Sequence, residues 1–261
     1  MRIVALVAVL LAAWPGLLRA DEGCRKLVYS ANPNYPPFHW SDNGRLLGAT
    51  VEITERILTE LRIPGEARYV GPWNRVLKAA ELGEIDLVLA LRRTPDREKF
   101  LQFGEAPFSA NPSAIFVRRD RRIAYRRWED LQPYRGGASL GDRFGEGFDE
   151  FMRHHLTIVP AYNLDRGFHD LDRGLTDYFV TGYQAGMAYV LGKNMEKRLM
   201  ALQPMVSQGE IHFGFSRHSP CRVLAARFDE KLRQYEREGR TEAILEKYLE
   251  RWRDSAADRV E

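Results

Sequence analysis

The feature that most constrains the fold is a nearly unbroken apolar run at residues 85–91, Ile-Asp-Leu-Val-Leu-Ala-Leu. A short apolar run of this kind is typical of a strand buried on both faces, as in the centre of a parallel sheet. Gly83 precedes the run and Thr94-Pro95 follows it, so one helix is expected to end before the strand and another to begin after it. This arrangement predicts an α/β fold.

The rest of the chain alternates in the same way between strand-like and helix-like segments. One predicted helix starts at Thr50 and ends before Pro64-Gly65, and a second runs from Trp73 to Gly83. The proline-rich stretch 32–40 is predicted to be a loop. Repeated strand–helix–strand units predict a mainly parallel sheet. The other expected strands are 26–30, 67–70, 114–118, 156–160, 177–181 and 211–216, and two further helices are expected after Pro220-Cys221 and around 244–249.

The first twenty residues have the pattern of a secretory signal peptide. A basic start at Met1-Arg2 precedes an apolar core, and cleavage is expected after Ala20. The alternative is a membrane anchor. It is disfavoured because the apolar run is shorter than the ~20 residues of a span and is broken by Pro15-Gly16. The protein is therefore expected to be exported.

The chain contains only two cysteines, Cys24 and Cys221. This number excludes a disulfide-rich scaffold and a four-thiolate zinc site. Because exported proteins fold in an oxidising compartment, the two cysteines are expected to pair, with two reduced structural thiols as the alternative. The bridge would tie the start of the mature chain to the helix that opens at Cys221.

Composition and charge exclude further function classes. Apolar residues make up 44% of the chain and charged residues 29%, as in globular proteins. Removal of residues 1–20 leaves 37 basic residues (39 minus Arg2 and Arg19) against 36 acidic ones, so no basic excess is available to attract nucleic acid. His154 and His155 are adjacent and cannot face one ion together from a helix. No metal or cofactor is expected.

The segment after the predicted buried strand has the features of an anion site. Thr94 is a suitable N-cap, Pro95 takes the first helical position and Asp96 lies in the first turn. A helix that starts at the end of a parallel strand presents backbone N–H groups to an anion, and Arg97 adds a planar fork for a carboxylate. The alternative is a solvated Arg97 that pairs with Asp96 or Glu98.

Several short motifs follow one another along the mature chain. They are Tyr35-Pro36-Pro37-Phe38, Gly44-x-x-x-Gly48, Trp73, Gly83-x-x-Asp86, Thr94-x-x-Arg97, Gly174-x-x-Asp177, Glu238-Gly239 and Tyr248-Leu249-x-x-Trp252. Their order and spacing resemble the family 3 extracellular solute-binding proteins, which include the polar amino-acid receptors of ABC importers. The resemblance implies a two-lobed α/β fold of the periplasmic-binding-protein type II class, with two hinge crossovers and a ligand cleft between the lobes. Lobe one would comprise 21–110 and 210–261, and lobe two 111–209.

The resemblance also implies which residues bind the ligand. Tyr35 and Trp73 match the two aromatic residues that sandwich it, and Arg97 matches the arginine that binds its carboxylate. Gly141 and Asp142 fall in the glycine turn of lobe two, which offers amides and a hydroxyl in the family.

The chain departs from the family pattern at two places. Gly182 stands where amino-acid receptors usually carry the aspartate that binds the ligand ammonium, and Leu91-Arg92-Arg93 replaces the usual Gly and Thr/Ser. The pattern therefore supports carboxylate binding more than it supports binding of an α-amino group. Asp142 is a candidate substitute partner for a cation, with an exposed loop acid as the alternative, and Arg92 suits a second acidic group on the ligand.

The leading interpretation is a monomeric periplasmic receptor, without enzymatic activity, for a small carboxylate-bearing, amino-acid-like solute. Hinge closure would capture the solute, and an inner-membrane ABC permease or a sensor would be the partner. One alternative is an enzyme on the same scaffold that resembles periplasmic cyclohexadienyl dehydratases, with Asp142, Glu105 or His39 as acid or base. The other is a ligand-sensing module that docks on a membrane receptor.

Overall fold

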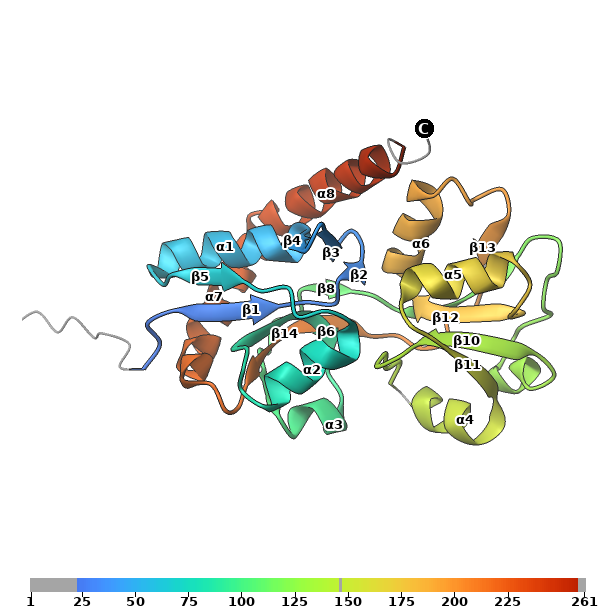
Figure 1. Ribbon diagram of the computed structural model, residues 1–261, viewed down its shortest axis with the longest axis horizontal. Helices are drawn as coiled ribbons and strands as arrows, with labels where there is room; N and C mark the ends of the chain where they lie inside the picture. Colours follow the sequence, from blue (N-terminus) through green and yellow to red (C-terminus); the bar gives the residue numbers. More distant parts are fainter. Residues whose placement is uncertain (1–22, 146, 258–261) are drawn as a thin grey trace, which may run out of the picture.

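The computed structural model describes residues 23–145 and 147–257, and the predicted signal peptide lies outside them. Two lobes lie side by side along the longest axis of the molecule, and each is built around its own β-sheet (Figure 1). Neither sheet closes into a barrel, and the predicted two-lobed α/β class is confirmed.

The sheet of the first lobe has the strand order β5-β1-β6-β14-β7, with β8 paired to β14. β5, β1 and β6 are parallel, whereas β14 is antiparallel to its neighbours. The apolar run that predicts a central strand forms β6 (Leu87–Arg92), which is buried over its first five residues. The other strands are β1 (Leu27–Ser30), β5 (Gly65–Ala67), β7 (Leu101–Phe103), β8 (Ser109–Ala110) and β14 (Glu210–Ser216).

Two amphipathic helices cover this sheet. α1 (Ala49–Leu61) buries Ile53 and Ile57, and it ends at Arg62, whose φ of 59° takes the chain out of the helix. α2 (Trp73–Glu81) buries Trp73 at its first position. The stretch 32–40, predicted to be a loop, instead contributes to a small sheet of β2 (Asn34–Tyr35), β3 (His39–Asp42) and β4 (Arg45–Leu47).

The sheet of the second lobe has the strand order β11-β10-β12-β9-β13. β10 is parallel to both of its neighbours, and β9 is antiparallel to β12 and β13. Its strands are β9 (Ser113–Arg118), β10 (Arg135–Ser139), β11 (Thr157–Ala161), β12 (Tyr178–Gly182) and β13 (Leu199–Ala201). The helices of this lobe are α4 (Phe148–His155), α5 (Leu164–Asp172) and α6 (Tyr183–Gly192).

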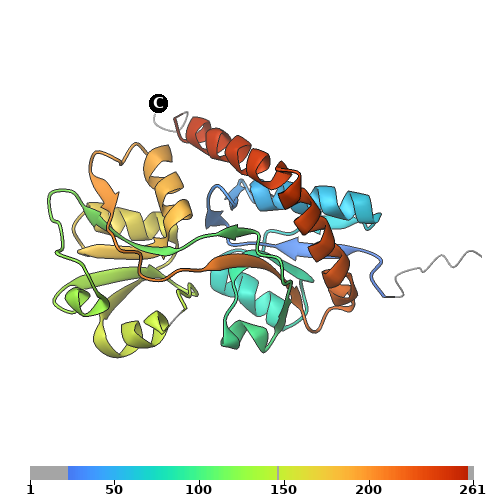
Figure 2. The same cartoon turned by 180° about the vertical axis from the view of Figure 1, so that it is seen from behind.

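The chain passes between the lobes in two segments, from β8 to β9 and from β13 to β14, which run together across one side of the molecule (Figure 2). The Asn111 N–H donates to the Gly209 carbonyl at 2.8 Å, and the Ser113 N–H donates to the Ser207 carbonyl at 2.9 Å. The two crossovers are therefore joined to each other by backbone hydrogen bonds.

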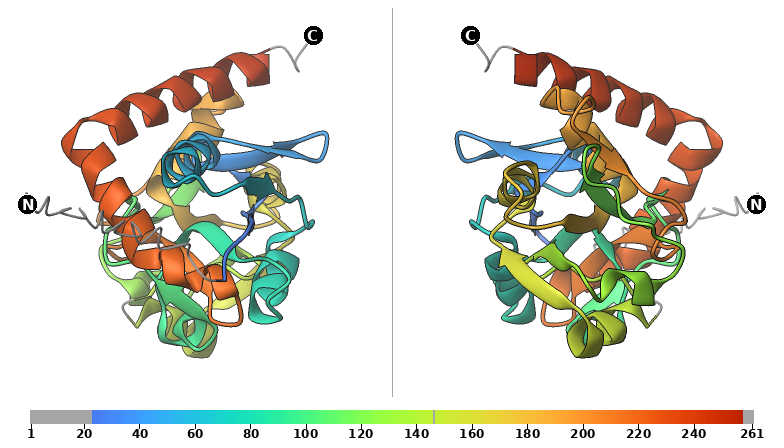
Figure 3. Two further views of the ribbon diagram at one scale, coloured as in Figure 1. Left: turned by 90° about the vertical axis from the view of Figure 1, so that its left-hand side faces the viewer. Right: turned by 90° about the vertical axis from the view of Figure 1, so that its right-hand side faces the viewer.

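The two last helices, α7 (Ala225–Arg237) and α8 (Arg240–Ala257), follow β14. α8 extends from the first lobe over α6 of the second (Figure 3). The Trp252 indole N–H donates to the Ala188 carbonyl at 3.0 Å, and the ring packs edge-on against Trp40 at 5.3 Å. Trp252 thus contacts both lobes.

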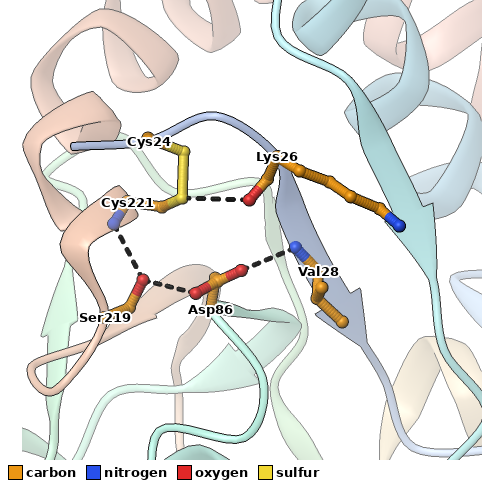
Figure 4. Close-up of a disulfide and its surroundings, with 6 residues drawn as sticks. All are labelled: Cys24, Lys26, Val28, Asp86, Ser219 and Cys221. Carbon is orange, nitrogen blue, oxygen red and sulfur yellow. Dashed lines mark hydrogen bonds between the residues drawn. A yellow bond between two sulfur atoms is a disulfide. The ribbon is translucent and has the colours of Figure 1, made fainter. Parts of the chain in front are cut away.

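The predicted disulfide between Cys24 and Cys221 is present and buried, with the two Cα atoms 4.5 Å apart (Figure 4). Beside it, the Asp86 carboxylate accepts the Val28 N–H at 2.7 Å and the Ser219 hydroxyl. Ser219 in turn accepts the Cys221 N–H at 2.9 Å. The bridge therefore joins the start of β1 to the segment after β14.

Several elements differ from the sequence prediction. α5 and α6 were not predicted, and α6 has no amphipathic period because β12, β9, β13 and α8 surround it. The strand expected at 67–70 lies at 65–67. The helix expected from Pro220 begins as a short 3-10 helix (Pro220–Leu224), which α7 continues.

Candidate functional site

A cavity between the lobes contains most of the residues that the sequence singles out. Tyr35, Trp73, Arg92, Arg97 and Asp142 all line it. Gly141 contacts two of them through its carbonyl, and Thr94 lies at the start of the helix that carries Arg97. The other lining residues are Asn32, His39, Ala90, Leu91, Asn111, Ser113, Arg143, Phe144, Gly182 and Ile211.

Arg97 is fixed by the turn that follows β6. The Thr94 hydroxyl accepts the Arg97 N–H at 3.4 Å and caps α3 (Pro95–Glu98). The guanidinium donates to the Arg92 carbonyl at 2.7 Å and to the Gly141 carbonyl at 2.9 Å. Asp96 pairs with Lys99, and Glu98 pairs with Arg93. The alternative, a solvated Arg97 paired with Asp96 or Glu98, is therefore not what the structure shows.

Burial sets the electrostatics of Arg97. Its side chain is 5% exposed, and it forms no ion pair with a carboxylate in the described part of the chain. Burial lowers its pKa to about 10, although the nearby Asp142 opposes the shift. Arg97 therefore remains a cation at neutral pH, in a place where an unpaired charge is costly.

Trp73 opens α2 and is also buried at the boundary between the lobes. Its indole N–H donates to the Gly141 carbonyl at 3.2 Å, and the Arg97 guanidinium lies 5.5 Å from its ring centre. Gly141 has a φ of 86°, and a Cβ there would lie 3.0 Å from the Trp73 ring. Glycine therefore lets one lobe-two carbonyl receive donors from both Trp73 and Arg97.

Tyr35 enters the cavity from β2. Its ring stacks on His39 at 5.8 Å, and its hydroxyl accepts a hydrogen bond from the Asn111 amide at 2.8 Å. Burial raises the pKa of Tyr35, so it stays neutral. A Cβ at Gly182 would lie 2.4 Å from both the Tyr35 hydroxyl and the Asn111 amide, so these two groups fill the space that a side chain at Gly182 would need.

Arg92 lines the cavity, but its guanidinium also contacts both crossovers. It donates to the Gln208 carbonyl at 2.8 Å, to the Asn111 carbonyl at 3.0 Å and to the Ser113 hydroxyl at 3.1 Å. A Cβ at Gly209 would lie 1.6 Å from this guanidinium. These contacts hold the crossovers together, and a contact of Arg92 with a second acidic ligand group stays a prediction.

Asp142 is the one acidic residue among those that line the cavity. Burial raises the pKa of its carboxyl to about 7, even though Arg97, Arg143 and Arg92 all act to lower it. Arg143 also donates to the Asp142 carbonyl at 2.8 Å. Asp142 thus changes its charge near neutral pH.

Among the lining residues that were not predicted as ligand contacts, Asn111 and His39 form side-chain hydrogen bonds within the first lobe or between the lobes. Asn111 links Tyr35 to the second lobe, because its side-chain oxygen also accepts the N–H of Gln184 in α6 at 3.0 Å. The His39 imidazole pairs with the Thr50 hydroxyl at 3.0 Å, and burial lowers its pKa to about 3. Nothing in the sequence around Asn111 indicates that it meets Tyr35, which is 76 residues away.

The described residues include no cluster of three or more histidine, cysteine, aspartate or glutamate side chains that could hold a metal ion. No helix within 23–145 and 147–257 combines the length and apolar character that crossing a bilayer requires.

Comparisons with known proteins agree on a family. Residues 27–251 match the family described as bacterial extracellular solute-binding proteins, family 3. The chain is 21% identical over 248 residues to the probable amino-acid-binding protein YxeM of Bacillus subtilis (strain 168), covering 95% of this chain and 92% of that protein.

Solved structures show the same fold. A histidine kinase sensor domain with similarity to periplasmic binding proteins is 25% identical with a TM-score of 0.76, covering 87% of this chain and 97% of the other. The amino acid ABC transporter substrate-binding protein AbpA of Streptococcus pneumoniae, solved with L-arginine, is 19% identical with a TM-score of 0.73, covering 87% and 96%.

Proposed function

Because the chain belongs to the family 3 bacterial extracellular solute-binding proteins, we propose that its interlobe cavity captures a small, carboxylate-bearing, amino-acid-like solute and that the lobes close around it. Arg97 binds the carboxylate, Tyr35 and Trp73 cover the ligand, and the Gly141-Asp142 turn contacts it from the second lobe. The moving bodies are then residues 21–110 with 210–261, and residues 111–209.

The observation that carries this proposal is the buried Arg97 guanidinium, which has no carboxylate partner among the described residues. An arginine side chain has five N–H donors, and only two of these meet backbone carbonyls here. The remaining donors suit a bidentate carboxylate, which would also supply the missing negative charge. The amino-acid-binding relatives support this class of ligand.

The direct test is a thermal-shift screen of the exported chain against amino acids, dicarboxylates and aromatic acids, each paired with its primary amide. At least one acid should raise Tm with increasing concentration, and its neutral amide should not, since the amide cannot pair with Arg97. Equal stabilisation by an acid and its amide would contradict carboxylate capture. A screen in which no acid raises Tm would contradict it as well.

Trp73→Ala should weaken ligand binding by about 1–3 kcal/mol, because the ring lines the cavity and covers apolar ligand surface. Titration calorimetry measures the change. Trp73→Phe is the matched control, since it keeps an aromatic ring over the ligand but loses the indole N–H that reaches Gly141 and part of the ring area. Wild-type affinity in Trp73→Ala, together with a lower Tm, would assign Trp73 to the core alone.

Carboxylate affinity should rise as pH falls through about 7. The pKa of Asp142 is about 7, so its carboxyl is ionised above this pH and repels a carboxylate bound at Arg97. Protonation removes the repulsion, while Arg97 keeps its charge. At about pH 8, Asp142→Asn should bind the acid with the affinity that the wild type shows at about pH 6, as measured by calorimetry. Affinity that falls with decreasing pH would instead show Asp142 pairing with a cationic ligand group.

A second candidate function is an enzyme on this scaffold, and one observation favours it: a pKa of about 7 suits Asp142 as a general acid or base. The other two candidates fit less well. Glu105 is exposed and does not line the cavity, and the low pKa of His39 keeps its imidazole neutral. Consumption of a stabilising acid by the wild type, but not by Asp142→Asn, would favour the enzyme.

The same family supports a proposal for the cellular setting. Its description as extracellular supports export through the predicted signal peptide, with cleavage after Ala20 and release into the periplasm. There the protein would act as a monomer and dock on an inner-membrane ABC permease or a sensor.

A further inference from the structure

A second cavity, of about 240 Å³, opens beside the first and shares Asn32 and Trp73 with it. On the second lobe it is bounded by Ser139, the last residue of β10, and by Tyr162-Asn163, which follow β11. Neighbouring parallel strands place their carboxyl ends at one sheet edge, where α/β proteins commonly bind ligands. We call this second cavity the side pocket.

The side pocket is polar and uncharged. Among its lining residues in the described part of the chain, none carries a charged side chain. The Ser139 hydroxyl is buried, with 8% of the residue exposed, and has no hydrogen-bond partner among the described residues. A buried polar group of this kind calls for a partner, and a hydrogen-bonding ligand group placed in the pocket would provide one.

Three asparagines add donors to this surface. The side-chain oxygens of Asn32, Asn34 and Asn163 accept the backbone N–H groups of Asn34, Asp165 and Arg166, at 3.0, 3.0 and 2.8 Å. Their NH2 groups remain as donors for carbonyl or hydroxyl oxygens. Tyr69 and Tyr162, 47% and 59% exposed, line the same pocket with aromatic surface.

The charges around the two cavities disfavour a cationic ligand tail. Arg92, Arg97 and Arg143 line the first cavity, and Asp142 is the single acid there. The side pocket offers no acid at all. A guanidinium or ammonium that left water for this pocket would lose its hydration without gaining a counter-charge.

We propose that the ligand is a carboxylate with an uncharged, hydrogen-bonding tail, such as an amide, urea or hydroxyl group, and that the side pocket holds this tail and rejects basic amino acids. The inference rests on the proposed function, because Arg97 must hold the carboxylate for the tail to pass between Asn32 and Trp73.

Isosteric acids test the tail directly. Citrulline and arginine share a head group, but citrulline ends in a neutral urea and arginine in a cationic guanidinium. The pair 5-ureidopentanoate and 5-guanidinopentanoate repeats the comparison without an α-amino group. The urea compound of at least one pair should bind about tenfold tighter or more in calorimetry. Equal or tighter binding of the guanidinium compounds overturns the inference, as does failure of every tested acid with a urea, amide or hydroxyl tail to bind.

An isosteric variant locates the tail. Asn32→Asp keeps the oxygen that accepts the Asn34 N–H and adds one negative charge where the two cavities meet. It should shift the preference towards the guanidinium member of each pair by about tenfold. Asn194→Asp, at an exposed position outside both cavities, adds the same charge and should leave the preference unchanged. An unchanged preference in Asn32→Asp overturns the placement of the tail.

The two levels of the proposal fail differently. If acids bind through Arg97 but prefer a cationic tail, the side-pocket inference is wrong and carboxylate capture stands. If no carboxylate of any kind binds, the proposed function itself is wrong.

Discussion

Replacing Arg97 with methionine should weaken carboxylate binding severely, with affinity falling by about 30-fold or more. Removing one partner of a buried, hydrogen-bonded charge pair costs about 2–5 kcal/mol. Here the variant would leave the ligand carboxylate without a counter-charge in a site that excludes water. Titration calorimetry of the wild type and Arg97→Met against the best acid from the screen measures the loss.

The unliganded fold should change much less than the affinity. Methionine fills a similar volume and removes a buried cation that has no carboxylate partner, while the Gly141 carbonyl keeps its hydrogen bond from Trp73. Arg97→Lys is the matched control, because it keeps the positive charge but loses the planar guanidinium that can bind a carboxylate through two hydrogen bonds. It should retain part of the affinity. Unchanged acid binding in Arg97→Met would show that Arg97 does not bind the carboxylate. A large fall in the Tm of the unliganded variant would show that Arg97 mainly stabilises the fold.

Removing the Cys24–Cys221 bridge should cause the largest loss of stability in this chain. The bridge closes a loop over a sequence separation of 197, for which the chain-entropy argument gives about 5 kcal/mol as an upper figure. Domains of this kind are stable by about 5–15 kcal/mol in total, so the loss is a large fraction. Denaturant unfolding of the Cys24→Ala, Cys221→Ala double variant against the oxidised wild type tests this.

Ligand affinity should survive this change where the variant is folded, because both cysteines lie in the first lobe, away from the cavity. Intact mass before and after reduction is the accompanying control, since the oxidised chain lacks two hydrogen atoms. Two thiols that react with an alkylating reagent in the folded, exported protein would contradict the bridge. A midpoint of denaturation equal to that of the wild type would show that the loop closure contributes nothing.

The sequence predicts the parts of this molecule whose causes are local. β6 is recognisable because burial on both faces requires a continuous apolar run, and the placement of Arg97 follows from a cap and a proline within one turn. α6 was missed because a helix that is covered on nearly all sides loses the periodicity that identifies helices. The disulfide was predictable from only two cysteines and an export signal.

The cavities depend on contacts that no local pattern carries. The Gly141 carbonyl lies 44 residues from Arg97 and 68 from Trp73, and Asn34 meets the N–H of Asp165 across a separation of 131 residues. The hydrogen bonds of Arg92 to the crossovers likewise join segments 19 to 116 residues apart. Family resemblance supplies the approximate positions of such residues, but the partner of each donor depends on how the two lobes meet.

The Gly141 carbonyl has a consequence for how affinities of this protein should be interpreted. It accepts hydrogen bonds from Trp73 and Arg97, so contacts between the lobes come from the chain itself as well as from a ligand. Such contacts set the population of the closed conformation, and the apparent Kd is the intrinsic Kd divided by the fraction of competent molecules. A substitution that acts only through this closed population, and touches no group that contacts the ligand, would therefore change the apparent affinity for every ligand by the same factor and leave the ranking of ligands unaltered.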